Sequence, residues 1–405
     1  MNDRQPKPPS PIKFEARQPE AGTALLFFIS GGSLALAREV FHPAHGWQRA
    51  DLSSAQLARD LPYGRCTDFA SALSVPAPGR AQAIHLAMVA RDEGNDRLYL
   101  SLSNPAADMA WSAAPAWLAC PFESGPVSTP SRLAITRVQL GDASDRPFIV
   151  VDVVVDPDGA APRQARYCID TGAGGADGAR PRWIEHKLPV NEAAIHAVCL
   201  GRCRGGWDVD GLYLGLCLAG EDSVEGEAEA QLLYAPLYNP FDPMQPRWSR
   251  RLEIPGKPAA DAIAACRHAD NTADLYVAAA GALHYFSAAN QNDGAQALTL
   301  VAAPEFAGVD TLFAAARRGR VTVWGLSRAG QVICTSAPQV YVADPAAWSR
   351  PAVVLSNVDA IAPCPDGDEA EDAFFAHTAG GLIKATRSPG NNLWISYGIV
   401  LPLRA

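Results

Sequence analysis

The chain has 405 residues, of which 48% are hydrophobic and 19% charged, and its formal net charge is −9. This length exceeds that of a usual single-core domain, so we expect several domains or a repeat array. A helical solenoid is disfavoured by 33 Gly and 33 Pro, because both residues break helices. The negative charge, with no run of Lys or Arg, argues against a nucleic-acid partner.

The N-terminal segment and the cysteines bear on localisation. Residues 1–10 are rich in Pro and are expected to form a disordered tail. No stretch resembles the apolar core of a secretory signal or a membrane-spanning helix, so we expect no membrane insertion. The nine cysteines lack the spacing of a disulfide framework, which favours reduced thiols. The sequence therefore predicts a cytoplasmic protein, or one exported without a conventional signal peptide.

Short apolar runs separated by turn residues follow one another along the first half of the chain. The first unit is expected to start near residues 12–14 and to turn at Gly31-Gly32. The second is assigned from residues 83–87, the third from 134–136 and the fourth from 194–198. Short apolar runs between turns are typical of β-strands. This part of the chain is therefore predicted to be all-β.

The last third of the chain repeats with a period of 49 residues. Asp261, Asp310 and Asp359 begin three successive apolar runs at this spacing. Gly281 and Gly330 each follow the preceding Asp by 20 residues, as expected for the tip of a tight hairpin that requires a positive φ. Gly381 takes the same place after a two-residue insertion. Such a period indicates small sheets that must pack on their neighbours.

A Trp precedes or opens the closing segment of most units. It recurs at Trp47, Trp117, Trp183, Trp248, Trp348 and Trp394. The gap of 100 residues between Trp248 and Trp348 is twice the short period, so one unit lacks its Trp, and Phe306 is assigned in its place. This count predicts seven units.

Four short strands per unit are typical of a propeller blade. We therefore predict an all-β, seven-bladed β-propeller of four-stranded antiparallel blades around a central channel. A pair of β-sandwiches is the alternative, but it gives no reason for a 49-residue period. The expected blades span residues 11–60, 61–125, 126–190, 191–257, 258–308, 309–357 and 358–405.

The blade pattern resembles that of a known family. The Leu-Tyr runs at 98–99, 212–213 and 275–276, the turn glycines and the closing Trp residues are similar to the repeats of bacterial and fungal lectin-type propellers, the tachylectin-2 and fucose-lectin group. The resemblance implies a propeller that binds carbohydrate. The fucose lectins hold sugar with an Arg, a Glu and a Trp from neighbouring blades, and this trio does not recur here at a fixed spacing.

Asp261, Asp310 and Asp359 are the most regular polar residues. If their strands line the channel, three carboxylates near one rim would suit Ca²⁺, which prefers several oxygen ligands. Alternatively, each Asp accepts a hydrogen bond from its own turn and binds nothing else. No motif calls for any other cofactor.

His85 and His196 each follow the Ile of an apparent first strand, in the second and fourth units. Two imidazoles near a channel would suit a transition metal. Alternatively, each is a polar strand residue with a local partner.

The Trp residues can likewise be interpreted in two ways. Trp47, Trp183, Trp248 and Trp348 offer flat platforms for a sugar ring if they are exposed, or fill the seams between blades if they are buried.

Catalytic motifs are weak. Asp170-Thr171-Gly172 matches the aspartic protease string, but the chain has no second copy to supply the partner carboxylate. The function predicted is therefore a non-catalytic recognition module that binds a glycan or a protein on a propeller face. Two alternatives stay open: a propeller enzyme with a metal site at the channel mouth, and a structural subunit of a toxin or secretion assembly.

Overall fold

A computed structural model describes the β-structure of the chain and the connections that are placed with it. Part of each unit is described, and the N-terminal tail predicted over residues 1–10 lies outside the described residues. Of the described segments, none is a helix long and apolar enough to cross a membrane. The described residues are 14–20, 23–30, 32–40, 46–52, 65–73, 83–92, 95–105, 117–121, 133–138, 148–155, 163–170, 182–187, 193–204, 210–220, 231–234, 250–256, 258, 260–267, 273–287, 294–317, 319–363, 373–388 and 393–399.

The first four sheets are formed by strands that follow one another in the chain. Sheet 1 contains β1 (Phe14–Glu20), β2 (Thr23–Ser30), β3 (Ser33–Val40) and β4 (Gly46–Asp51). Sheet 2 contains β5 (Arg65–Leu73), β6 (Ala83–Asp92), β7 (Asn95–Pro105) and β8 (Leu118–Ala119). Sheet 3 contains β9 (Leu133–Val138), β10 (Phe148–Val155), β11 (Arg163–Asp170) and β12 (Arg182–Lys187). Sheet 4 contains β13 (Ala193–Arg204), β14 (Asp210–Gly220), β15 (Gln231–Tyr234) and β16 (Arg250–Glu253).

The last three sheets follow the same order. Sheet 5 contains β17 (Ala260–Arg267), β18 (Ala273–Ala279), β19 (Ala282–Phe286) and β21 (Leu298–Val301). Sheet 6 contains β22 (Val309–Arg317), β23 (Arg320–Ser327), β24 (Val332–Pro338) and β25 (Ala352–Leu355). Sheet 7 contains β26 (Val358–Pro363), β27 (Ala373–Thr378), β28 (Gly381–Arg387) and β29 (Trp394–Ile399). The short β20 (Ala295–Gln296) adds to sheet 4 in parallel with β16, and the 3₁₀ turns η2 (Gln339–Tyr341) and η3 (Pro345–Ala347) join β24 to β25.

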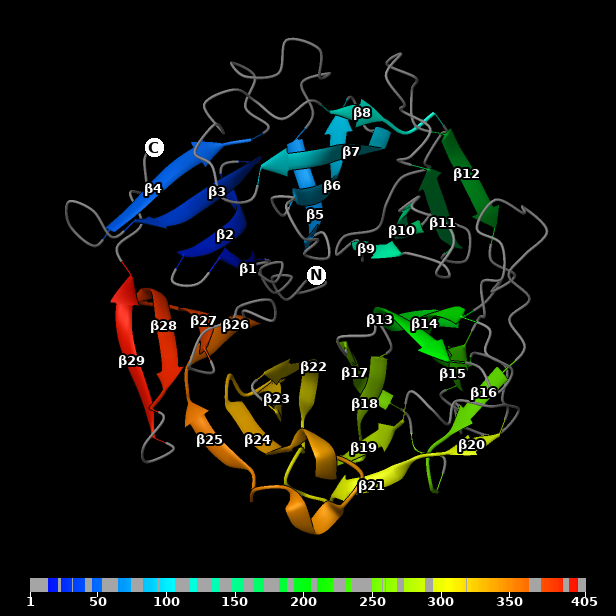
Figure 1. Ribbon diagram of the computed structural model, residues 1–405, viewed down its shortest axis with the longest axis vertical. Coiled ribbons are helices and arrows are strands. Elements are labelled where there is room, and N and C mark those ends of the chain that lie inside the picture. The colour runs from blue at the N-terminus through cyan, green and yellow to red at the C-terminus, as the bar shows by residue number, and fades with distance from the viewer. Residues whose placement is uncertain are drawn as a thin grey trace, which may run out of the picture.

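The sheets are arranged around a common centre as a β-propeller (Figure 1). Within each sheet the strands pair antiparallel in chain order, so the first strand lies innermost and the last lies at the outer edge. The inner strands β1, β5, β9, β13 and β17 each contact the inner strand of the next sheet, the last of these contacts joining β17 to β22. Sheet 6 contacts sheet 7 through β23 and β26, and β26 contacts β1. The predicted all-β propeller class is therefore confirmed.

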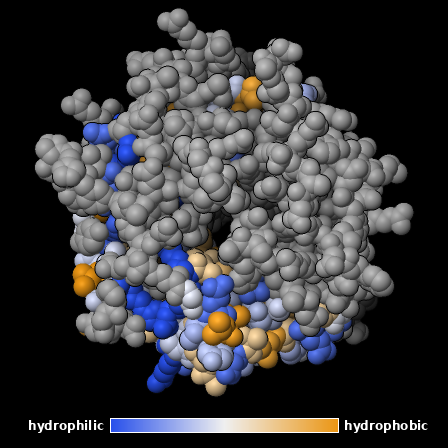
Figure 2. Space-filling view, viewed as in Figure 1, coloured by the Kyte–Doolittle hydropathy of each residue, from blue (hydrophilic) through white to orange (hydrophobic). Residues whose placement is uncertain are grey.

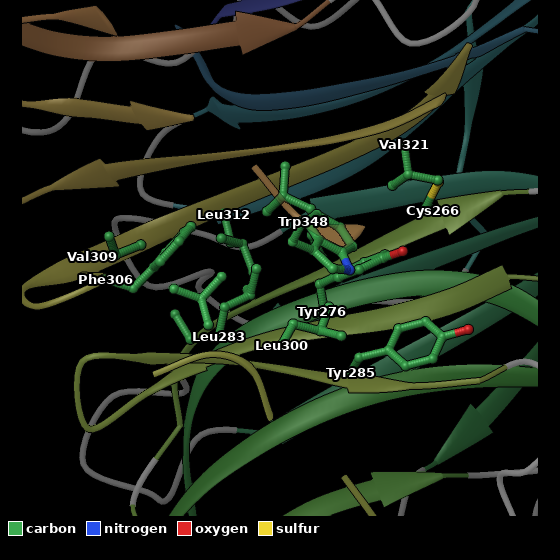
Figure 3. Close-up of a cluster of buried hydrophobic side chains, with 14 of the residues drawn as sticks. Cys266, Tyr276, Leu283, Tyr285, Leu300, Phe306, Val309, Leu312, Val321 and Trp348 are labelled. Carbon is green, nitrogen blue, oxygen red and sulfur yellow. The ribbon is translucent and has the colours of Figure 1, made fainter. Parts of the chain in front are cut away.

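Sheet 5 buries both of its faces against neighbouring sheets. Side chains alternate along a strand, so Tyr276 on β18 packs toward sheet 6, whereas Leu275 and Val277 pack on the opposite face with Ile254. Figure 3 shows the seam between sheets 5 and 6, where Tyr276 and Leu283 meet Val309, Leu312 and Trp348. A sheet buried on both faces explains why the strands read as continuous apolar runs.

The first and last sheets also share a core. Phe14 and Leu26 pack in one cluster with Ala362, Phe375 and Ile399 of sheet 7. A charged pair lies in the same seam: the Lys384 ammonium donates to both carboxylate oxygens of Glu39, at 3.4 Å to Oε1 and 3.3 Å to Oε2. The Glu39 side chain is 2% exposed and that of Lys384 12% exposed. Sheets 1 and 7 are thus held together by side chains, and none of the described strands is exchanged between them.

Turn glycines of sheets 1, 5 and 6 connect these sheets to the next one. Gly281 and Gly330 have φ values of 78° and 72°, as the hairpin prediction requires. The carbonyl of Gly281 accepts a hydrogen bond from the Phe306 N–H at 2.9 Å, and that of Gly330 accepts one from the Val358 N–H at 3.0 Å. Gly32 receives the Cys66 N–H in the same way at 2.7 Å. The hairpin tip therefore fixes the point at which the chain enters the next sheet.

Two assignments made from the sequence are wrong. The first strand of sheet 2 is β5, whereas the run at residues 83–87 belongs to β6, the second strand. β5 was not recognised in the sequence because it contains polar residues, among them Asp68 and Ser71, although both are buried. Phe306 also does not replace a closing Trp, because it follows the outer strand β21 and is buried at the entry to β22.

Candidate functional site

The three repeated Asp residues occupy one structural position. Asp261, Asp310 and Asp359 are each the second residue of an inner strand, and each is skipped in the pairing with the second strand. Such a skipped residue is a β-bulge, which turns a side chain away from the ladder. The 49-residue period therefore corresponds to a bulge at the same rim of sheets 5, 6 and 7.

The Asp residues have local partners. Asp310 Oδ1 accepts a hydrogen bond from Thr311 Oγ1 at 3.2 Å, and its Oδ2 lies 3.9 Å from Arg328 Nε. Asp359 Oδ2 lies 3.2 Å from His377 Nδ1. Within the described ranges, no three His, Cys, Asp or Glu side chains lie close enough together to hold a metal ion. The structure does not bring these three carboxylates together, and Ca²⁺ binding by them stays a prediction.

His85 and His196 do not occupy equivalent places. His85 lies on β6, the second strand of sheet 2, whereas His196 lies on β13, the first strand of sheet 4. The expected equivalence of the two residues is therefore wrong, because the sequence alignment missed β5. His85 is 5% exposed, and the side chain of His196 lies outside the described residues.

The closing Trp residues lie at seams between sheets. Trp348 is 8% exposed, donates from Nε1 to the Val342 carbonyl at 2.9 Å, and stacks edge-on against Tyr276 of sheet 5 at 5.9 Å between ring centroids. Trp117 donates to the Leu52 carbonyl, at the end of sheet 1, at 3.1 Å. A buried ring offers no face to a solute, so Trp348 is left out of the ligand set proposed below.

The other three Trp residues differ in exposure and partners. Trp47 is half-buried and meets Phe375 of sheet 7 edge-on, at 5.7 Å between ring centroids. Trp183 is half-buried on β12, where it pairs in register with Ile169. Trp248 lies outside the described residues. Each described closing Trp of sheets 1, 2 and 6 thus contacts the sheet before it around the ring.

A polar corner lies in the seam between sheets 6 and 7. Trp324, Leu326 and Cys334 fill this seam with apolar side chains along most of its length. At the start of β23, the same face of sheet 6 carries Arg320 and Ser336 in their place, because Thr322 pairs with Ser336 as Trp324 pairs with Cys334. Arg320 Nη1 donates to Ser336 Oγ at 3.0 Å. The strand alternation therefore places a guanidinium in the seam.

Sheet 7 supplies a second guanidinium to this corner. Arg387, the last residue of β28, donates from Nη1 to the same Ser336 Oγ at 3.1 Å. Its register partner on β29 is Trp394, which is half-buried and packs on Phe374 at 5.1 Å between ring centroids. Register partners extend from the same face of a sheet. We call Arg320, Arg387, Ser336 and Trp394 the arginine corner.

Ser349 anchors the corner through the backbone of Ser336. Ser336 is 1% exposed, its N–H donates to Ser349 Oγ at 3.0 Å, and its carbonyl accepts from the Ser349 N–H at 2.8 Å. Within the described part of the chain Arg320 forms no ion pair, and its side chain donates to the hydroxyl oxygen of Ser336. Strongly hydrophilic residues also gather over the sector of sheets 6 and 7 in the space-filling view (Figure 2). Two guanidinium groups from neighbouring sheets therefore donate to one buried hydroxyl oxygen.

The sequence reasoning missed this site. Arg320 and Arg387 share neither a motif nor a repeat position, since one opens a second strand and the other closes a third strand. One signal was available, because an Arg at the end of an apolar strand is more often paired or functional than buried alone. The convergence on Ser336 requires the arrangement of both sheets.

Buried thiol and phenol groups near the seam of sheets 5 and 6 stay protonated. Burial raises the pKa of the Cys266 thiol far above its usual range, and nearby Asp274 raises it further. Burial likewise raises the pKa of the Tyr276 hydroxyl. Because the thiolate is the nucleophilic form, Cys266 is not poised as a nucleophile.

His284 gives the fold a pH dependence. It is 5% exposed on β19, with Nδ1 3.2 Å from Thr299 Oγ1, and burial lowers its pKa below the ordinary value of 6.5. The unfolded chain then binds the proton more readily, so the stability that neutral His284 contributes is present above pH 6.5 and is lost as the pH falls below it. We expect urea unfolding at pH 7.5 and pH 5 to differ less for His284→Gln than for the wild type. Equal pH dependence of the two proteins would contradict this account.

Comparisons with known proteins give distant structural similarities. No protein-family model and no curated protein sequence matches the chain. A fucose-recognising lectin of Aleuria aurantia, described as a six-bladed β-propeller, is similar over 97% of each chain at 11% identity and a TM-score of 0.45. The protein AofleA of Arthrobotrys oligospora is similar over 97% of this chain and 87% of its own at 12% identity and a TM-score of 0.43. An α-L-arabinofuranosidase of Fusarium graminearum is similar over 79% of this chain and 89% of its own, at 10% identity and a TM-score of 0.46. These values are too low to assign a function to the chain.

Proposed function

We propose that this protein is a non-catalytic recognition module that binds a glycan at the arginine corner, on a seven-bladed ring closed between sheets 1 and 7. The observation that supports it most is the convergence of Arg320 and Arg387 on Ser336 beside the ring of Trp394. The ring would close through the Glu39–Lys384 pair and the shared core of sheets 1 and 7.

The chemistry of the corner suits a sugar. A guanidinium presents several N–H donors in a planar fork, which matches paired oxygens on a ligand. The indole of Trp394 offers an apolar face to a pyranose ring, since aromatic rings contribute large contact areas at little entropic cost. Polar donors that fix orientation beside an aromatic surface are typical of small-molecule sites.

A protein partner is the second candidate. Val340 and Tyr341 on η2 are 83% and 58% exposed, and Val353 on β25 is 52% exposed. Large apolar side chains that are exposed on one sheet are typical of contact surfaces.

A glycan array tests the proposed function. Fluorescently labelled full-length protein is expected to bind a subset of immobilised glycans, and soluble forms of those glycans are expected to compete. Trp394→Ala should lose most of this signal, because the apolar face of the site is removed. Trp47→Ala serves as the control, since that ring packs on Phe375 at another seam. Absence of binding to every glycan, with folding verified by circular dichroism, would exclude the proposal.

A further inference from the structure

We infer that the outer strand β29 pairs edge to edge with the same strand of a second copy of this chain, so that the protein is a two-fold symmetric dimer in solution. This inference goes beyond the proposed function and does not depend on it. It rests on the direction of the backbone groups of β29, on its lack of charge and on the apolar side chains exposed at its start.

The first argument is the direction of the backbone groups. β29 ends the strand order of sheet 7 and lies at the outside of the ring, so none of the described strands covers its outer edge (Figure 1). The Ser388 N–H donates to the Leu393 carbonyl at 2.8 Å, in the same unbroken register that pairs β28 with β29. Opposed residues of an antiparallel pair alternate between hydrogen-bonded and non-hydrogen-bonded. Trp394, Ser396 and Gly398 therefore direct their N–H and C=O groups away from β28, toward the outer edge.

The second argument is that this edge is complementary to itself. A two-fold axis at Ser396 places this residue opposite Ser396 of the second copy, and Trp394 opposite Gly398 of the second copy. All three positions direct their backbone groups outward, so each opposed pair can exchange two hydrogen bonds. Ser396 and Gly398 are small and exposed. Side chains project from the faces of a sheet and not from its edge, so the pairing leaves the Trp394 ring in its seam.

The third argument is the absence of the features that prevent such pairing. Edge strands are commonly protected by charged residues, by Pro or by short length. The six residues of β29 include no charged residue and no Pro. The uncharged outer strands β21 and β25 have four residues each. The outer strands β4, β12 and β16 all carry charges, at Arg49, Asp51, Arg182, Glu185, Lys187, Arg250, Arg251 and Glu253.

Exposed apolar side chains accompany the uncharged edge. Leu393 and Ile395 are 61% and 57% exposed. A second β29 brings no like charge against them and covers part of their apolar surface, which stabilises the pair. A second copy of the chain therefore matches this edge in length, in hydrogen-bonding pattern and in charge.

Sedimentation velocity of the full-length protein between about 1 and 100 µM is the direct test, and we expect a shift from monomer to dimer across this range. Ser396→Pro removes an outward N–H and retains the hydrogen bonds to β28, because Pro is tolerated at the outer edge of a sheet. It should weaken the dimer at least about tenfold, since two hydrogen bonds are lost by symmetry. Ser396→Ala keeps the N–H and is the matched control, which should dimerise as the wild type does.

A pair of charged variants tests the position of the two-fold axis. Ser396→Lys and Ser396→Asp each place like charges opposite each other in a homodimer, so each variant alone should dimerise more weakly than the wild type. An equimolar mixture of the two should recover the dimer, because opposite charges then face each other across the axis. This test remains decisive if the Pro variant fails to fold.

The outcomes are distinct. A wild-type protein that stays monomeric at the highest concentration would overturn the inference. A dimer that Ser396→Pro leaves unchanged, or a mixture of the charged variants that associates no better than either alone, would show that another surface forms the contact. Hydrogen–deuterium exchange should show protection of the amides of residues 394–399 that is lost on dilution, and equal exchange at both concentrations would also overturn the inference. Circular dichroism and the melting temperature of each variant verify that the fold is intact.

Discussion

Glu39→Ala is expected to destabilise the protein by about 3–5 kcal/mol, because it leaves the ammonium of Lys384 buried and without its carboxylate. Both side chains lie in the seam between sheets 1 and 7, where Lys384 Nζ also lies 5.7 Å from the centre of the Phe375 ring. That ring offers a weak alternative to the lost carboxylate. Urea unfolding followed by tryptophan fluorescence measures the change.

A double variant separates the ion pair from the packing of the seam. Glu39→Met combined with Lys384→Met removes both charges and retains side-chain volume, so it should be close to wild type in stability. If the single Glu39→Ala change cost less than about 1 kcal/mol, the pair would behave as an exposed one and sheets 1 and 7 would not be closely packed in solution.

Trp348→Ala is expected to destabilise the protein by about 3–5 kcal/mol, through loss of a large buried side chain and the cavity that it leaves. The ring lies between the loop that carries it and Tyr276 of the preceding sheet, and its Nε1 satisfies the Val342 carbonyl. The effect should appear as a lower urea midpoint with an altered near-ultraviolet spectrum.

Tyr341→Ala is the matched control for this prediction. Tyr341 lies in the same connection between β24 and β25, but 58% of it is exposed. Its removal should change the unfolding free energy by less than about 0.5 kcal/mol. Comparable losses of unfolding free energy for the two variants would contradict the conclusion that Trp348 packs in the seam between sheets 5 and 6.

Much of the fold follows from local signals in the sequence. Gly281 and Gly330 were placed at hairpin tips because tight turns need a positive φ, and both have one. The spacing of Asp261, Asp310 and Asp359 reflected a bulge repeated at the same inner-strand position. β5 was not predicted, because its buried Asp68 and Ser71 interrupt the apolar pattern on which strand prediction depends.

The site could not be predicted in the same way. Arg320 and Arg387 are 67 residues apart in number, lie on different sheets and meet only because the faces of sheets 6 and 7 are packed together. The closing Trp residues could not be interpreted from the sequence alone, since an indole can either bind a sugar ring at the surface or fill a seam between two sheets. The packing of Trp348 on Tyr276 depends on a neighbouring sheet that no single repeat contains.

A crystal structure of the protein with a glycan selected from the array tests the central claim most directly. The account predicts sugar oxygens within hydrogen-bonding distance of Arg320 and Arg387, and a sugar ring against Trp394. A glycan bound at another seam or face, with the arginine corner empty at the same concentration, would contradict it.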